Sequence, residues 1–490
     1  MRRRYKVQRT AAAPTPRQTF ILITHSNSPL SISAFPPENN NIMASRDHIP
    51  SQDSDRPFKG DDDGAVEAQT QAPMQMDQLD GGRYAWQSVI ASFATLFIVF
   101  GIQTSYGVFL AWYSKHDFPN ASTTQLTLVG SLNPGVMFVS GLFVGRIAET
   151  VGFRPVMAAG CVLMTVGLLL ASFATQVWQL ALTQGAMCGL GAALVFFPGV
   201  SLPSQWWLKR RSLAMGLSMA GSGVGGLAVV NIATALLPSV GSAWTLRVLA
   251  ATSGVMLALA TVMAETRVPK RTIANGGRAS ALIDFELFRD RRFLAMVFAS
   301  LVVPFGMLTP YFYLPTYTVA IAQSTPAFAS LLLTILNVFS IAGRIISGAV
   351  ADHIGNINTY ILTTVATGAV TLAMWLPAGT SQPILAVYAA AFGFFSGGFV
   401  AQMPPIMAQQ FGIAKLPSIL GLMYAAFAAG NLAGGPVAGA IVEASAGSTV
   451  FPSLQFGWGI LYTGLVWIVG AAGAMYLRFG LLDSAVWKAY

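Results

Sequence analysis

About twelve long apolar segments, which run from Val89 to Leu477, constrain this sequence more than any other feature. Each has roughly 17 to 25 residues, the length that an α-helix needs to span a bilayer. The expected spans are residues 89–112, 126–144, 156–174, 177–200, 213–237, 248–264, 293–319, 328–350, 360–376, 384–407, 419–442 and 456–477. Backbone polar groups find no partners in lipid, so segments of this kind cross a membrane as helices. The sequence therefore predicts an all-α polytopic membrane protein.

Composition supports this class and argues against an enzyme. Hydrophobic residues make up 54% of the chain and charged residues only 10%, whereas soluble domains carry about 25% charged residues. Cys161 and Cys188 both lie in apolar segments, so we expect neither a disulfide framework nor a metal site. No nucleophile or carboxylate pair falls within the spans, and no cofactor is expected.

An internal repeat divides the spans into two groups of six. A loop motif recurs at an offset of 203 residues (348 − 145, 352 − 149 and 355 − 152), and a glycine pair recurs at 205 (421 − 216 and 430 − 225). The residues concerned are Gly145, Glu149, Gly152, Gly216 and Gly225 in the first half and Gly348, Asp352, Gly355, Gly421 and Gly430 in the second. Such a repeat predicts two parallel six-helix bundles, over residues 86–264 and 293–480, joined by a central loop over residues 265–292.

The basic residues predict the orientation. With the N-terminus inside, most of the cations beyond the tail fall on the cytoplasmic side, including Lys209-Arg210-Arg211, the central loop and Arg154, which belongs to the first copy of the loop motif. The net charge of +9 then reflects topology, so no nucleic-acid partner is expected. The triplet Asn120-Ala-Ser122 falls in an outer loop and is a candidate glycosylation site.

Residues 1–85 and 481–490 are expected to be cytoplasmic tails, the first of them disordered because it is polar and rich in Pro, Ser, Gln and Asp. Six basic residues precede Glu38, the first acid, which is also a pattern of mitochondrial transit peptides. We favour an unstructured tail and a plasma-membrane protein, with vacuolar and mitochondrial membranes as alternatives. The expected partners are the lipid bilayer and a small organic anion, and the chain is expected to be a monomer.

Arg344 is the one ionisable side chain between Phe328 and Val350. It lies eight residues before Asp352, roughly 12 Å inside the membrane boundary. A charge at such a depth marks a substrate or gating site by default, and the alternative is an arginine that locks the two halves together. Uncharged polar residues at similar depth are candidates to line a cavity or to join helices: Gln103, Asn133, Gln184, Asn231, Asn337, Gln402 and Asn431. Tyr311, in an aromatic run over residues 310–315 that is expected to close the seventh span, completes the candidate set.

The repeated loop motif in two six-helix halves resembles that of the major facilitator superfamily of secondary transporters. Within it the chain is similar to the monocarboxylate transporter family, especially its fungal branch. Three stretches carry this resemblance: residues 80–86 (Asp-Gly-Gly-Arg-Tyr-Ala-Trp), residues 206–216 (Trp-Trp-Leu-Lys-Arg-Arg-Ser-Leu-Ala-Met-Gly) and Gly343-Arg344 with Gly348 and Asp352. The resemblance implies alternating access and a substrate-binding role for Arg344.

The chain departs from the animal members of that family at two positions that bind the carboxylate and its proton. Thr104 stands in place of the lysine and Ser340 in place of the aspartate, so only the arginine is retained. These departures favour export of a fungal secondary metabolite. The alternatives are a permease for uptake of a monocarboxylate or other nutrient, and a membrane nutrient sensor that transports nothing.

Overall fold

The computed structural model describes residues 80–268, 285–445 and 452–481. The predicted tails therefore lie almost wholly outside the described residues, as does the middle of the central loop. One boundary is wrong, because residues 80–85 of the predicted disordered tail are ordered and the first helix begins at Arg83. The reason is a set of hydrogen bonds and ring contacts that tie this segment to the loop before α7, described below.

The N-terminal half comprises α1 to α7. Its elements are α1 (Arg83–Trp112), η2 (Tyr113–Asp117), α2 (Thr123–Val151), α3 (Phe153–Ala171), α4 (Val177–Leu180), η3 (Ala181–Met187), α5 (Cys188–Ser201), α6 (Pro203–Trp206) and α7 (Arg211–Met263). Helix α7 contains two membrane passes, because Gly241 breaks it with φ 77° and ψ 173°. Only glycine adopts such a conformation readily, so Gly241 marks the turn between the fifth and sixth spans.

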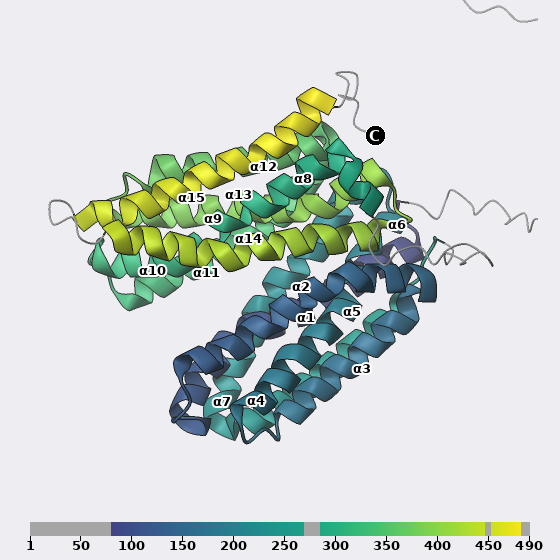
Figure 1. The fold of residues 1–490 in the computed structure, drawn as a ribbon, viewed down its shortest axis with the longest axis horizontal. Helices are drawn as coiled ribbons and strands as arrows, with labels where there is room; N and C mark the ends of the chain where they lie inside the picture. Colours follow the sequence, from purple (N-terminus) through teal and green to yellow (C-terminus); the bar gives the residue numbers. More distant parts are fainter. Residues whose placement is uncertain (1–79, 269–284, 446–451, 482–490) are drawn as a thin grey trace, which may run out of the picture. The chain divides into compact units, whose positions relative to one another are not determined.

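The C-terminal half comprises the elements from η4 onward. They are η4 (Phe285–Arg289), α8 (Arg291–Val302), α9 (Pro304–Met307), α10 (Thr309–Ala320), α11 (Pro326–Ile354), α12 (Asn356–Val370), η5 (Thr371–Trp375), α13 (Gln382–Phe411), α14 (Leu416–Ser445), α15 (Pro452–Met475) and η6 (Tyr476–Leu481). Eleven helical spans in the described residues are long and apolar enough to cross a membrane, and the double pass of α7 accounts for the twelfth expected span. The prediction of an all-α membrane protein is confirmed (Figure 1).

The predicted position of the aromatic run is wrong. Residues 310–315 do not close the seventh span, which continues to Ala320. Pro304 and Pro310 instead divide this span into α8, α9 and α10, since a proline inside a helix removes one hydrogen bond and clashes with the preceding turn. The side chain of Tyr311 is consequently placed along the span and not at its end.

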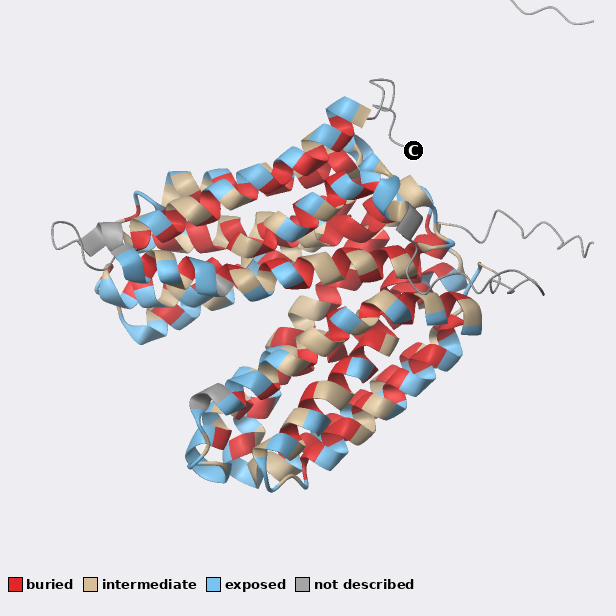
Figure 2. Cartoon of the chain, in the orientation of Figure 1, coloured by how far each residue is buried: buried red, intermediate tan, exposed pale blue. Residues whose placement is uncertain are grey.

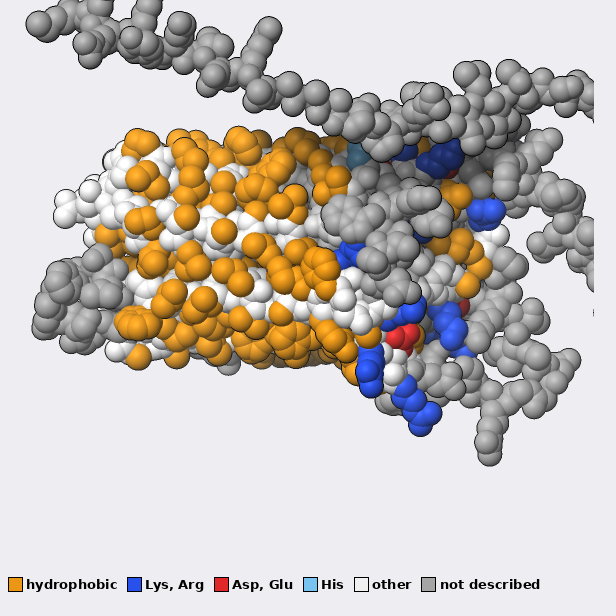
Figure 3. All heavy atoms as spheres, turned by 90° about the horizontal axis from the view of Figure 1, so that it is seen from above, with side chains coloured by type: hydrophobic (Ala, Val, Ile, Leu, Met, Phe, Trp, Pro, Cys, Tyr) orange, Lys and Arg blue, Asp and Glu red, His pale blue; other side chains and the backbone are white. Residues whose placement is uncertain are grey.

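Each of the long helical spans carries both buried and exposed residues (Figure 2). Large apolar side chains such as Phe196, Phe399 and Trp467 are fully buried between helices, while others such as Val162 and Val262 are more than 60% exposed. Hydrophobic side chains cover most of the face seen in Figure 3, and Lys and Arg side chains gather at one end of it. This distribution fits a protein whose outer surface contacts lipid along most of its helix length.

The repeat seen in the sequence is reproduced by close contacts between helices. A Cβ added to Gly216 of α7 would lie 2.3 Å from the carbonyl oxygen of Arg344, and one added to Gly421 of α14 would lie 2.0 Å from that of Gly141. Both the glycines (421 − 216 = 205) and their partners (344 − 141 = 203) are related by the repeat. The crossing of α7 with α11 and the crossing of α14 with α2 are thus equivalent, and each depends on a glycine without a side chain.

Candidate functional site

The loop-motif acids join the two halves. We call the end of the helices at which Glu149 and Asp352 lie the loop-motif end. The carboxylate of Asp352, on α11, accepts hydrogen bonds from the backbone N–H groups of Ser212 (2.9 Å) and Leu213 (3.0 Å) in the first turn of α7. These N–H groups have no partner within their own helix, and the helix dipole favours a negative charge there. Asp352 therefore caps a helix of the opposite half.

Glu149 makes the equivalent contact in the other direction. Its carboxylate, on α2, accepts hydrogen bonds from the backbone N–H of Ser418 (3.2 Å) and from the Ser418 hydroxyl (2.5 Å) at the start of α14. Arg146 lies 3.4 Å from its second oxygen. The repeat thus places one acid from each half on the first turn of a helix in the other half, and these contacts hold the halves together at the loop-motif end.

The motif glycines explain how this arrangement is reached. Gly152 and Gly355 end α2 and α11 with φ 106° and φ 93°, a conformation that favours glycine. Gly145 and Gly348 face the opposite half, where an added Cβ would lie 2.5 Å from the backbone at Pro417 and 2.4 Å from the carbonyl oxygen of Ser212. Arg154 is not part of the contact, because its guanidinium pairs at 2.6 Å with Glu265, which follows α7.

Arg344 bridges the same two halves deeper in the membrane. Its NH1 group donates a 2.9 Å hydrogen bond to the carbonyl oxygen of Met219 and a short one to the hydroxyl of Ser222, both on α7. Its Nε is buried without a hydrogen-bond partner in the described residues. The guanidinium therefore holds α7 through NH1, while its Nε–H donor is unused.

Two tyrosines lie in the neighbourhood of this arginine. Tyr311 of α10 and Tyr424 of α14 both lie near enough to Arg344 for an electrostatic interaction. The ring of Tyr424 also stacks on Phe138 of α2 at 5.8 Å and contacts Phe196 of α5 at 5.2 Å. An aromatic cluster thus fills the crossing of α2 with α14, beside the polar crossing made by Arg344.

The sequence did not identify Tyr424, Ser222 or Phe138 as site residues. One signal was present for Tyr424, because the repeat offset of the glycine pair relates it to Met219 (424 − 205 = 219), whose carbonyl oxygen binds Arg344. Serine and phenylalanine are common in membrane helices, so Ser222 and Phe138 carried no comparable signal.

Three of the predicted amides form one network inside the N-terminal half. The Gln103 side chain on α1 donates to the Asn133 side chain on α2 at 3.2 Å, and Asn133 donates to the backbone carbonyl of Gln184 at 3.1 Å. The Gln184 side chain in turn accepts a 3.1 Å hydrogen bond from the hydroxyl of Tyr113. These residues join helices, which is the common role of amides in membrane proteins.

The remaining predicted amides do not meet Arg344 through a hydrogen bond. Asn337 donates to the Leu333 carbonyl of its own helix at 2.8 Å. Gln402 donates to the Ser347 hydroxyl at 3.4 Å, and its buried side-chain oxygen has no partner in the described residues. Asn120 is exposed in the loop between η2 and α2.

The first two family-like stretches form a single unit at the loop-motif end. The Asp80 carboxylate accepts hydrogen bonds from the backbone N–H groups of Leu208, Lys209 and Arg210, at 2.8, 2.8 and 3.3 Å. The ring of Tyr84 stacks on Trp206 at 5.3 Å, and that of Trp86 meets the edge of Trp207 at 5.2 Å. The start of α1, with Asp80 before it, and the entry into α7 therefore fold onto one another.

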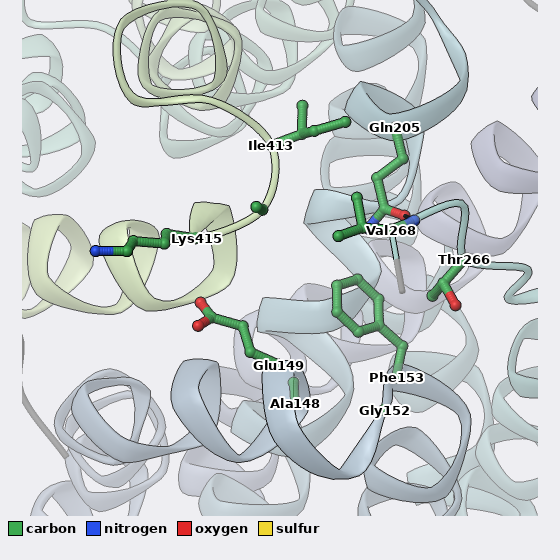
Figure 4. A pocket seen from close by; sticks show the side chains of 10 residues that line it. Ala148, Glu149, Gly152, Phe153, Gln205, Thr266, Val268, Ile413 and Lys415 are labelled. Carbon is green, nitrogen blue, oxygen red and sulfur yellow. Dashed lines mark hydrogen bonds between the residues drawn. The ribbon is translucent and has the colours of Figure 1, made fainter. Parts of the chain in front are cut away.

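A cavity of about 360 Å³ lies beside the Glu149 contact (Figure 4). It is bounded by α2, the segment after α7 and the loop before α14, and the Glu149 carboxylate points toward the segment that carries Ile413 and Lys415. Both halves therefore contribute residues to the lining of this cavity.

Comparisons with known proteins agree with this architecture. Residues 91–392, more than half of the chain, match the model of the Major Facilitator Superfamily. The MFS transporter asaE of Aspergillus flavus is 31% identical over 368 residues, which cover 75% of this chain and 82% of that protein. The fujikurins efflux protein of Gibberella fujikuroi is 29% identical over 450 residues, which cover 91% of this chain and 94% of that protein.

The aspyridones efflux protein of Emericella nidulans is 29% identical over 366 residues, covering 74% of this chain and 73% of that protein. Among solved structures, the human organic anion transporter MFSD10 superimposes with a TM-score of 0.61, covers 80% of this chain and 99% of that one, and is 15% identical, so it shows the fold alone. The chain belongs to the major facilitator superfamily. It is a multi-pass secondary transporter.

Proposed function

We propose that this transporter exports a small organic anion, a fungal secondary metabolite, and that Arg344 binds the anionic group. The observation that carries the proposal is the partly paired guanidinium of Arg344 at the crossing of the two halves. Arginine stays charged at any physiological pH, and its planar fork grips a carboxylate through two hydrogen bonds. Similarity to proteins named for efflux of fujikurins and aspyridones supports the metabolite class and the direction.

The state of the structure is consistent with release on the outer side. The loop-motif end is closed by Asp352, Glu149 and Arg344. The positive-inside rule places this end in the cytoplasm. Thr104 and Asn231 are exposed within their spans. Because polar side chains at this depth are costly in lipid, we infer that these two face a water-accessible passage. We infer that the passage opens to the outside and that residues 86–264 and 293–480 are the two rocking units.

Arg344 then couples binding to movement. While the loop-motif end is open, the guanidinium has no contact with α7 and is available to an anion. When the halves close there, the Met219 carbonyl and the Ser222 hydroxyl occupy the NH1 group of Arg344, so an anion competes with them for one side of its two-bond grip. This competition lowers the affinity for the anion on the outer side, which is the behaviour that export requires.

We also propose a narrower family and a membrane for this protein. The unit formed by Asp80, Tyr84 and Trp206 supports membership of the monocarboxylate transporter family, because both of its stretches are family-like and they contact one another. We place the protein in the plasma membrane, with Asn120 outside and glycosylated.

Substitution of Arg344 tests the proposal. A panel of aromatic and aliphatic carboxylic acids, each paired with its methyl ester, is screened for stabilisation of the purified protein, and an acid that binds is taken into flux assays in oriented vesicles. Arg344→Gln should weaken binding of the acid by about 10- to 100-fold, since hydrogen bonds to charged groups are worth about 1.5–3 kcal/mol. Arg344→Lys keeps the charge but loses the planar fork, so its affinity for the acid should lie between those of the wild type and Arg344→Gln.

The control is Arg247→Gln, which removes an arginine that stacks on Phe173 and Trp244 outside the site. It should leave the affinity for the acid unchanged. Equal loss of the acid and its ester in Arg344→Gln would contradict an anion-binding role and leave Arg344 as a lock between the halves. Net movement only toward the cytoplasm would overturn export in favour of uptake.

A further inference from the structure

A groove lies on the outer surface of the C-terminal half, between α8 and α15, away from the crossing of the two halves. Its volume is about 470 Å³. Small residues form the floor, where a Cβ on Gly473 would lie 2.4 Å from the carbonyl oxygen of Ala295. Leu294, Phe298 and Tyr476 line it with side chains that are 43%, 42% and 49% exposed. The two helices are in close contact at the floor, so the groove is shallow and faces the surroundings of the protein.

The groove carries a cation at one end. Arg291, the first residue of α8, lines it and is exposed at the loop-motif end. The neighbouring acid Asp290 caps α8 by accepting a 2.7 Å hydrogen bond from the backbone N–H of Arg292. The ion pairs found in the described residues, Arg146 with Glu149 and Arg154 with Glu265, do not include Arg291. Lys and Arg side chains gather at one end of the face seen in Figure 3, beyond a wide hydrophobic area.

The order of these groups along α8 matches the order of groups in a lipid. Arg291 and Phe298 are about 10 Å apart along the axis of α8, so the charged end of the groove is separated from its apolar part by this distance. Arginines at the edge of a membrane span attract anionic headgroups, and basic sites between helices bind them specifically. The apolar part of the groove lies where acyl chains surround the protein, so an occupant of another class would have to displace lipid.

We propose that this groove binds one anionic glycerophospholipid, with its phosphate on Arg291 and an acyl chain along Leu294 and Phe298. The inference is independent of the transported substrate, since none of these residues contacts Arg344. The lipid comes from the bilayer leaflet at the loop-motif end.

Native mass spectrometry of the purified protein tests the proposal. The protein is titrated with dioleoyl phosphatidylglycerol or dioleoyl phosphatidylcholine, and the fraction carrying one lipid is measured. We expect tighter retention of the anionic lipid. Arg291→Gln should weaken that retention about five-fold, the effect of one cation near a membrane surface. Ala472→Trp, at an exposed position in the groove, should fill the space for the acyl chain and displace the lipid without altering the charge.

Arg292→Gln is the matched control, because it removes the same charge from the adjacent residue, which does not line the groove. It should retain the anionic lipid better than Arg291→Gln does. Equal losses in the two variants would show diffuse electrostatic attraction and overturn the proposal. It would also be overturned if Ala472→Trp, with an unchanged melting temperature, kept the lipid, or if inorganic phosphate at equal concentration displaced it.

Discussion

Removing the charge of Asp352 should open the loop-motif end. In Asp352→Asn one side-chain oxygen remains to accept a hydrogen bond from the first turn of α7, but the second charge-assisted bond and the interaction with the helix dipole are lost. Hydrogen bonds to charged groups contribute about 1.5–3 kcal/mol, and a helix terminus adds about 0.3–1 kcal/mol. Because Asp352 is half-buried and one hydrogen bond survives, we expect the substitution to destabilise the closed state relative to the open state by about 2 kcal/mol.

That loss is large for a conformational equilibrium. A change of about 2 kcal/mol shifts the ratio of closed to open molecules about 30-fold, so a ratio of about 100:1 falls to about 3:1. Spin labels at Lys209 and Ile354, which are exposed on opposite halves at the loop-motif end, report this shift as a second, longer distance. The two native cysteines are buried and remain unlabelled.

The control is Asp290→Asn. This acid caps the first turn of α8 in its own half, so the same substitution removes a helix cap without touching the contact between halves. It should leave the distance distribution unchanged. If Asp352→Asn gave only the short distance of the wild type, or if both variants broadened the distribution equally, the capping argument would be refuted.

Three further predictions rest on single contacts. Asn133→Ala breaks two interhelical hydrogen bonds and should lower the free energy of unfolding in detergent by about 1–3 kcal/mol, whereas Asn337→Ala, which breaks a bond within one helix, should cost less. Gly421→Ala places a Cβ 2.0 Å from a carbonyl oxygen of α2 and should depopulate the closed state in the spin-label assay, while Gly107→Ala has open space and should not. Asn120→Gln should remove the glycan, and a wild-type protein from yeast without a mass shift after deglycosylation would contradict the outer placement of this loop.

The sequence predicted those features for which the position itself restricts the type of residue. Segment length and apolarity gave the spans, and the repeat offset gave the paired glycines, because bilayer thickness and close backbone approach each constrain residue type directly. Arg344 was also evident, since a charge inside an apolar span needs a partner.

The partners of Arg344 were not predictable in the same way. The Met219 carbonyl belongs to the backbone, so any residue at that position would supply it. The order of residues 80–85 was missed because it depends on Trp206 and the N–H groups after it, about 120 residues away. Contacts between segments this far apart leave no local pattern in a single sequence.

The departure from the repeat at position 344 distinguishes the two crossings. The repeat relates Arg344 to Gly141 and Met219 to Tyr424, so one crossing contains an arginine bound to a backbone carbonyl and the other a glycine beside an aromatic cluster. The ring contacts of the aromatic cluster have preferred geometries but contain no hydrogen bond that an anion could replace, whereas the donors of a guanidinium can be exchanged between a carbonyl and a carboxylate. In the proposed transport cycle the crossing of α7 with α11 therefore responds to the substrate, and the crossing of α2 with α14 closes in the same way whether or not the substrate is bound.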